Sequence, residues 1–235
     1  MTGTRVPKYW LVKGELLRLI AEGAPGSALP TERDLAERLA TSRTTVRQAI
    51  AELVVEGRLE RPQGSGTYIA EPKLVHVRQL TSFTEDLGPH RVQNRVLDVR
   101  REVPSPAVAE RLGLAAGERV HRVERMRIVD GDPLAHESAT LVGDLPDLRA
   151  ELERRGSLYA TLREAYGIEV AEVEDEVQTR LADPAEAAHL DVETGHPLLL
   201  VHRLARDPAG RPVEWTRSVF RGDRFRFVAR ARRGQ

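Results

Sequence analysis

The segment Ser42-Arg-Thr-Thr-Val-Arg-Gln-Ala-Ile50 predicts a short amphipathic helix. Apolar residues in it and just beyond it recur at i, i+3, i+4 and i+7, the spacing of one buried helical stripe: Val46, Ala49, Ile50 and Leu53. Arg43 and Arg47, four residues apart, share a different face. Ser42 is a good N-cap, so the partial positive charge of the helix N-terminus lies beside both arginines. We expect this face to lie against DNA phosphates.

The neighbouring segments complete a DNA-binding architecture. Thr31 caps a preceding helix that turns Leu35 and Leu39 inward, and only two residues separate it from the helix at Ser42. An earlier helix over about 8–22 adds further apolar positions, namely Leu11, Leu16, Leu19 and Ile20. Two short strands, Leu59–Arg61 and Thr67–Ala70, flank Pro62-Gln-Gly-Ser-Gly66. Three helices and a hairpin predict a winged helix-turn-helix over residues 1–71.

Charge alone leaves two interpretations of this region open. A helix-turn-helix also occurs in proteins that never touch DNA, and an arginine face is often simply solvated. Residues 1–72 hold ten Lys and Arg against nine Asp and Glu. The local pattern favours DNA, because three arginines and no acid lie between Glu37 and Glu52.

This region resembles the DNA-binding domain of GntR-family bacterial transcription regulators. The resemblance rests on Leu29-Pro-Thr-Glu-Arg-Asp-Leu-Ala36, Thr41-Ser-Arg-Thr-Thr-Val-Arg-Gln-Ala49, Leu53 to Gly57 and Arg61 to Thr67. It implies a homodimer on double-stranded DNA at a palindromic operator. It also implies a set of DNA-contacting residues from two helices and the wing: Arg33, Ser42, Arg43, Thr44, Thr45, Arg47, Gly64 and Gly66.

Length and composition predict a second domain. The chain has 235 residues, and those after Pro72 suffice for another hydrophobic core. We expect a linker over 72–78 and a second domain over 79–235. The chain has no cysteine, so disulfides and thiolate chemistry are excluded. No apolar run is long enough for a membrane span and no signal peptide is evident, which predicts a cytoplasmic protein with no membrane partner.

The second domain is expected to be α+β, with hairpins interrupted by helices around an antiparallel sheet. Turn signals at Asp130-Gly-Asp-Pro133 and Asp207-Pro-Ala-Gly210 predict two hairpins. The predicted strands are Val92–Val99, Val120–Val129, Leu134–Val142, Val170–Leu181, Pro197–Arg206 and Pro212–Arg221. The predicted helices are Pro106–Leu112, Asp147–Arg154, Leu158–Ala165 and Pro184–Leu190.

The sequence contains no credible catalytic constellation. Its seven histidines show no metal-binding spacing, and neither a nucleophile elbow nor a phosphate-gripping loop occurs. The acidic run Glu172–Glu176 fits a solvated strand edge better than a catalytic site. We therefore expect no enzyme activity, no metal and no cofactor.

A binding site is better supported. Period two along Arg122-Val-Glu-Arg-Met-Arg-Ile places Arg125 and Arg127 on one face of a strand. Two guanidinium groups on the same face repel each other unless an anion lies between them. That anion is either a carboxylate of the chain, such as Glu137 or Glu214, or a phosphate or carboxylate of a ligand.

The second domain resembles the UTRA effector domain of the HutC subfamily, which has a chorismate-lyase-like fold used for sensing small molecules. The resemblance rests on Leu80-Thr-Ser-Phe-Thr-Glu-Asp-Leu87, Arg122 to Pro133, Glu137-Ser138, Gly156-Ser-Leu-Tyr159 and Arg211 to Phe225. Three stretches are most similar to DasR-type regulators, which implies a phosphorylated amino sugar as effector: Arg5-Val-Pro-Lys-Tyr9, Leu53 to Arg61, and Val213-Glu-Trp with Arg217 to Arg224. The implied effector-binding residues are Thr81, Ser82, Phe83, Arg125, Arg127, Glu137, Ser157, Tyr159, Glu214 and Phe220.

Two departures from the family pattern keep the effector open. Relatives commonly have tyrosine at Phe220, and the stretch after Leu87 is slightly shorter here. The expected function is a repressor that a phosphorylated sugar releases from its operator. The alternatives are another anionic effector, effector-promoted DNA binding, a DNA-binding scaffold that senses nothing, or an enzyme with a DNA-binding head.

Overall fold

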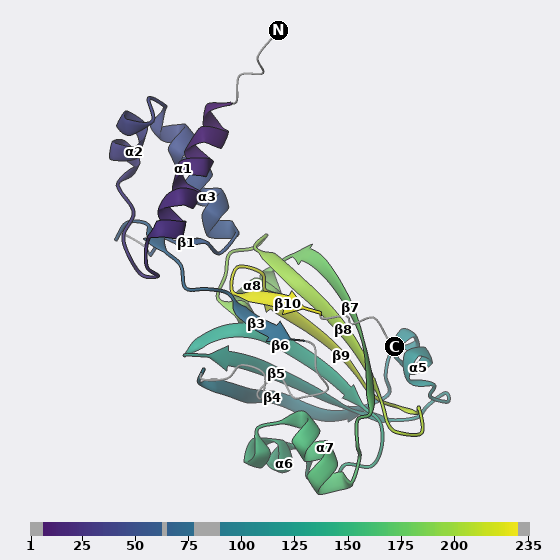
Figure 1. Ribbon diagram of the computed structural model, residues 1–235. Helices are drawn as coiled ribbons and strands as arrows, with labels where there is room; N and C mark the ends of the chain where they lie inside the picture. Colours follow the sequence, from purple (N-terminus) through teal and green to yellow (C-terminus); the bar gives the residue numbers. More distant parts are fainter. Residues whose placement is uncertain (1–6, 63–64, 78–89, 230–235) are drawn as a thin grey trace, which may run out of the picture. The chain divides into compact units, whose positions relative to one another are not determined.

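The computed structural model describes residues 7–62, 65–77 and 90–229, and the chain folds into two compact units (Figure 1). The first unit holds Met1–Lys73 and Gly222–Arg224, and the second holds Leu74–Arg221 and Phe225–Gln235. Among the described residues, no helix is both long and apolar enough to span a bilayer.

The first unit is a three-helix domain with a small hairpin. Its elements are α1 (Lys8–Glu22), α2 (Glu32–Arg38), α3 (Arg43–Val55), β1 (Leu59–Glu60) and β2 (Tyr68–Ile69). The two strands pair antiparallel. Leu16, Leu35 and Leu53 lie in the centre of its core, with no exposed surface. The predicted winged helix-turn-helix is confirmed, because the apolar stripe of α3 is buried as its spacing requires.

Local hydrogen bonds fix where α2 and α3 begin. The Thr31 hydroxyl accepts from the backbone N–H of Asp34, and the Ser42 hydroxyl accepts from that of Thr45 at 3.1 Å. Each side chain satisfies one N–H group that the helix itself leaves without an acceptor. Ala40, with φ 46°, makes the sharp turn between the helices.

The second unit is built on one six-stranded antiparallel sheet, in the order β4-β5-β6-β9-β8-β7 (Figure 1). These strands are β4 (Val92–Glu102), β5 (Val120–Val129), β6 (Asp132–Leu141), β7 (Glu172–Leu181), β8 (Pro197–Arg206) and β9 (Pro212–Arg221). Its helices are α5 (Pro106–Leu112), α6 (Leu148–Arg155), α7 (Leu158–Tyr166) and α8 (Pro184–Leu190). The expected α+β class is confirmed, and β7 with its acidic run is an edge strand.

Alternate residues of β6 contact two hydrophobic clusters on one face of the sheet, with a polar residue between them. Ala139 and Leu141 pack with residues of α6 and α7. Ala135, at the other end, packs with Phe220 and Phe225. Glu137 lies between these two apolar clusters and is 4% exposed. One face therefore carries a buried polar position between two hydrophobic ones.

Two strands were not expected from the sequence. Strand β3 (Leu74–Val77) pairs in parallel with β10 (Phe225–Val228), and Leu74 is opposite Phe225. The expected linker over 72–78 thus includes residues whose backbone is paired in a strand. Strand β10 lies near the other end of the sequence, so no local pattern predicts its pairing with β3.

Candidate nucleic-acid interface and effector site

The N-terminal end of α3 presents its polar side chains outward. Arg43 and Thr44 are exposed, Thr45 is half-buried, and the exposed Ser42 hydroxyl also lies 2.8 Å from that of Thr45. Arg33, from the first turn of α2, has a side chain that is 74% exposed. Most of the predicted DNA-contacting residues on α2 and α3 therefore have exposed side chains.

Arg47 differs from Arg43 in having an ionic partner. Its Nε and Nη2 donate to the Glu32 carboxylate at 3.2 and 3.0 Å. Arg61, at the base of the wing, donates from Nη2 to the same carboxylate at 2.9 Å. Hydrogen bonds from Arg47, with a smaller contribution from Arg61, lower the pKa of Glu32. Arg43 makes no ion pair within the described part of the chain.

The wing is described on either side of its tip. Gly66 has φ 110°, a backbone conformation that favours glycine, and Tyr68 donates a hydrogen bond to the Ser65 carbonyl at 2.6 Å. Gly64 lies outside the described residues.

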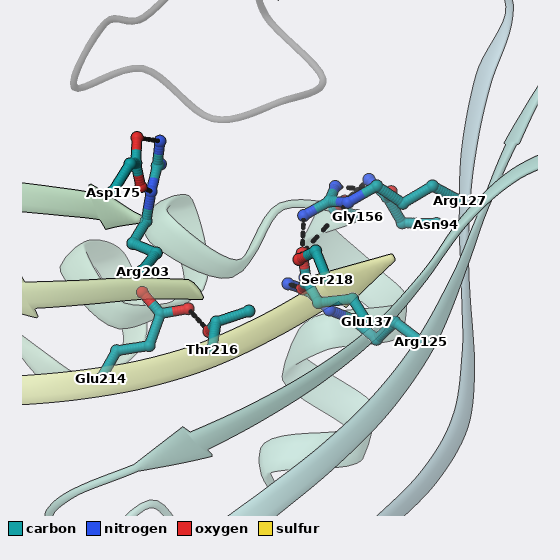
Figure 2. Close-up of polar contacts among 10 residues, drawn as sticks. All are labelled: Asn94, Arg125, Arg127, Glu137, Gly156, Asp175, Arg203, Glu214, Thr216 and Ser218. Atoms are coloured by element: carbon teal, nitrogen blue, oxygen red, sulfur yellow. Dashed lines mark hydrogen bonds and ion pairs between the residues drawn. The ribbon is translucent and has the colours of Figure 1, made fainter. Parts of the chain in front are cut away.

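In the second unit, strand register brings the candidate effector residues together (Figure 2). Arg125 of β5 is opposite Glu137 of β6, and Glu137 is opposite Ser218 of β9. On the other side of β5, Arg127 is opposite Asn94 of β4. Four adjacent strands therefore contribute polar side chains to one buried patch.

Glu137 is the anion between the two arginines. Its carboxylate accepts from Arg125 Nη2 and from Arg127 Nη2, and also from Arg127 Nε at 3.1 Å. Ser218 donates to it at 3.3 Å, and Arg127 Nη1 donates to the Asn94 side-chain oxygen at 3.1 Å. Of the two possibilities left open by the sequence, a carboxylate of the chain itself occupies this position in the structure.

A second ion pair borders the same patch on β7 and β8. Arg203 donates to both oxygens of Asp175 at 2.7 and 2.8 Å. Although burial lowers the pKa of Arg203, its hydrogen bonds to Asp175 raise that pKa overall. Next to this pair, Glu214 accepts a hydrogen bond from the Thr216 hydroxyl.

Arg125 Nε is a buried donor that lacks a hydrogen-bond partner among the described residues. The Tyr159 hydroxyl, in contrast, interacts with the side chains of Arg203 and Glu214. Burial lowers the pKa of Arg125 to about 10, and burial followed by repulsion from Arg125 lowers that of Arg127. Burial, followed by the nearby Glu214 charge, raises the pKa of Tyr159. A buried donor without a partner, such as Arg125 Nε, costs free energy.

The remaining predicted effector residues lie at the border of the patch or outside the described residues. Ser157 caps α7, accepting from the N–H of Ala160 at 3.3 Å. Phe220 is 6% exposed and stacks on Phe225, with 4.1 Å between ring centroids. Thr81, Ser82 and Phe83 are outside the described residues.

The sequence analysis missed several residues of the patch: Asn94, Asp175, Arg203, Thr216 and Ser218. A period-two signal existed for Thr216 and Ser218, which alternate with Trp215 and Arg217 along β9. For Asn94 and Asp175 the deciding information is the pairing of strands that are distant in sequence, which one strand alone cannot reveal.

Comparison with known proteins assigns both units. The model "Bacterial regulatory proteins, gntR family" matches residues 8–69, and the UTRA domain model matches residues 89–226. The chain belongs to the GntR family. It is 33% identical over 228 residues to the HTH-type transcriptional repressor NagR of Bacillus subtilis, covering 95% of this chain and 94% of NagR.

Two further comparisons concern PhnF. The HTH-type transcriptional repressor PhnF of Mycolicibacterium smegmatis is 34% identical over 228 residues, covering 96% of this chain and 93% of PhnF. The crystal structure of PhnF from Mycobacterium smegmatis matches with a TM-score of 0.67 at 32% identity, covering 94% of this chain and 99% of that one. These findings confirm that this GntR protein combines a DNA-binding head with a UTRA domain and is a transcriptional regulator, not an enzyme.

Proposed function

We propose that this GntR regulator is a repressor that binds a palindromic operator as a homodimer and is released by a phosphorylated sugar. The names of NagR and PhnF describe transcriptional repressors, and both cover nearly the whole chain. The DNA-contacting set that we propose remains the one expected from the sequence, and its outward side chains on α2 and α3 support that assignment.

The observation that carries the effector assignment is the buried pair Arg125 and Arg127 with one carboxylate between them. Two guanidiniums and Glu137 leave one positive charge, and Arg125 Nε has no partner among the described residues. A phosphate supplies both negative charge and several acceptors for such a pair. The Glu214 carboxylate and the Tyr159 hydroxyl, which interact with each other beside this pair, are groups of the kind that bind the hydroxyl or amine groups of a sugar.

An amino sugar phosphate satisfies both halves of this site, because its amine complements a carboxylate while its phosphate complements the arginines. Phe220 gives the site an apolar wall where a tyrosine would give a hydroxyl. Release then requires that the effector bind the DNA-incompetent state more tightly, since equal affinity for both states shifts nothing.

The DNA assignment is tested by replacing Arg43 and Arg47 with Ala together. We expect specific operator retention in a gel shift to be lost while the circular dichroism spectrum is unchanged, because both side chains are exposed. Arg18→Ala, an exposed arginine on α1, is the matched control. If the double variant retains the operator as well as the parent does, the α3 face that carries Arg43 and Arg47 does not bind DNA.

The effector assignment is tested by thermal shift with a phosphorylated hexosamine, the same hexosamine without phosphate, and inorganic phosphate. We expect stabilisation chiefly by the first, cancelled in Arg125→Lys, which keeps the charge but loses the fork of donors. Arg122→Lys, on the same strand but the opposite face, is the control. If the phosphorylated hexosamine still raises the unfolding temperature of Arg125→Lys, the phosphate site lies elsewhere. If another anion raises the unfolding temperature instead, the effector is a different one.

A further inference from the structure

Glu32 occupies an unusual position for an acid on a surface expected to face a polyanion. It is the first residue of α2, yet its side chain is only 11% exposed because two guanidiniums cover it. Those of Arg47 and Arg61 are 57% and 47% exposed. The three residues together present a net positive, outward surface with the carboxylate beneath it.

The hydrogen bonds to Glu32 use only some of the N–H donors of the Arg47 guanidinium. Its Nε and Nη2 bind Glu32 side-on, which fixes the plane of the guanidinium. An arginine has five N–H donors, so the edge formed by Nη1 and the second hydrogen of Nη2 stays available. That edge is the fork that pairs with guanine O6 and N7 in the major groove.

Arg61 connects the wing to the same carboxylate, that of Glu32. It follows β1 directly and shares the Glu32 carboxylate with the recognition helix, so the wing base and α3 are tied through one acid. The sequence analysis did not include Arg61 or Glu32 among the DNA-contacting residues.

We propose that Glu32 is a positioning residue for DNA recognition, which aims Arg47 at a base edge and holds Arg61 as an additional DNA contact. Arg43, which has no such acid partner in the described part of the chain, acts independently of Glu32. A carboxylate in this role lowers affinity for DNA in general and raises discrimination, because it repels phosphates while fixing the geometry of one base contact.

The test uses the full chain and two duplexes of equal length, one selected from a random-sequence pool by the unchanged protein and one scrambled. For Glu32→Gln we expect the ratio of specific to non-specific affinity to fall about tenfold, the size of one lost base contact. Binding to the scrambled duplex is expected to stay equal or strengthen, and the salt dependence to steepen as the freed arginines move to phosphates. Glu37→Gln is the matched control, since it removes the same charge from an exposed position of the same helix, and Glu37 makes no ion pair with Arg47 in the described part of the chain.

Double-mutant cycles separate positioning from a purely structural role. Glu32→Gln should couple to Arg47→Ala and to Arg61→Ala, so that each pair costs less than the sum of its single changes, and should add independently to Arg43→Ala. Urea denaturation of each variant shows whether the fold is intact. Equal effects of Glu32→Gln and Glu37→Gln on the affinity ratio, or equal coupling to Arg43 and Arg47, overturn the proposal.

Discussion

At the scale of single residues, the second unit buries three charged side chains close together. Arg125, Arg127 and Glu137 are 3%, 8% and 4% exposed. Removing such groups from water costs more than their mutual attraction returns unless their remaining donors and acceptors are satisfied. Arg125 Nε has no hydrogen-bond partner among the residues that the structure describes. The proposed effector would supply the missing polar groups.

Glu137→Gln should make the protein less stable and more responsive to anions. The change leaves two buried guanidiniums facing each other without a counter-charge, which costs about 3 kcal/mol. Thermal unfolding in phosphate and in chloride at equal ionic strength measures the response, and phosphate should raise Tm more in the variant than in the parent. Ser218→Ala, which removes one hydrogen bond to Glu137 but no charge, is the control. An equal phosphate effect in parent and variant contradicts the prediction.

Glu124, on the opposite face of β5, should contribute to acid stability. Although its burial raises the pKa, hydrogen bonds from His136 and Arg122 lower the pKa of Glu124 from 4.5 to about 2. A depressed carboxyl pKa stabilises the folded state above about pH 4.5, and that contribution is lost as the pH falls to about 2.

The lost contribution amounts to about 3 kcal/mol at about 1.4 kcal/mol per pKa unit. Urea unfolding between pH 4.5 and 2 measures it, and Glu124→Gln should flatten the slope of stability against pH in that window. Glu153→Gln, an exposed carboxylate of α6, should leave the slope unchanged. If the stability of Glu124→Gln depends on pH as steeply as that of the parent protein, the Glu124 carboxyl does not cause the loss of stability in acid.

At the scale of elements, the sequence predicted the bounds of those helices and strands whose ends are marked by local residues. Helices α1, α5 and α8 and strands β5, β8 and β9 have their predicted bounds, because caps, prolines and turn residues mark their ends. Strands β3 and β10 escaped prediction because they are four residues long and pair only with each other. Asp175 was missed although its strand was predicted, because only the pairing of β7 with β8 shows that it binds Arg203.

Asp183→Ala should destabilise the second unit through helix α8. Asp183 accepts from the N–H of Glu186 at 2.9 Å, and the Glu186 side chain accepts from the N–H of Asp183 at 3.2 Å. Loss of this capping box costs about 1 kcal/mol, measured as a lower urea midpoint. Ser105→Ala is a matched control, because Ser105 precedes α5 without making a capping side-chain bond. Equal losses in the two variants reject the capping explanation.

At the scale of the whole molecule, overall charge says little about DNA binding. The chain holds 36 basic and 36 acidic residues, so its attraction to DNA depends on local surfaces of the head. In the proposed dimer, one bound head raises the effective concentration of the other, which increases the affinity for an operator with two half-sites.

A duplex that carries one half-site should therefore bind far more weakly than one that carries both. The expected loss is about a hundredfold or more, since tethering rather than new contacts provides the gain. Fluorescence anisotropy with the two duplexes at one salt concentration measures it. Shifting one half-site by half a helical turn is the control and should weaken binding as much as deleting that half-site. Similar affinity for all three duplexes contradicts the dimeric mode.

The parallel pairing of β3 with β10 has a practical consequence for building biosensors from this protein. Residues that immediately follow the DNA-binding head in the sequence are, in the fold, part of the sensor, and Phe225 anchors them from the other end of the chain. A chimera that exchanges heads should be joined before Leu74, so that the transplanted sensor keeps its own strand. A junction placed after Val77 would graft a foreign strand against Phe225–Val228, and a sensor trimmed before Phe225 would leave β3 with no strand to pair with.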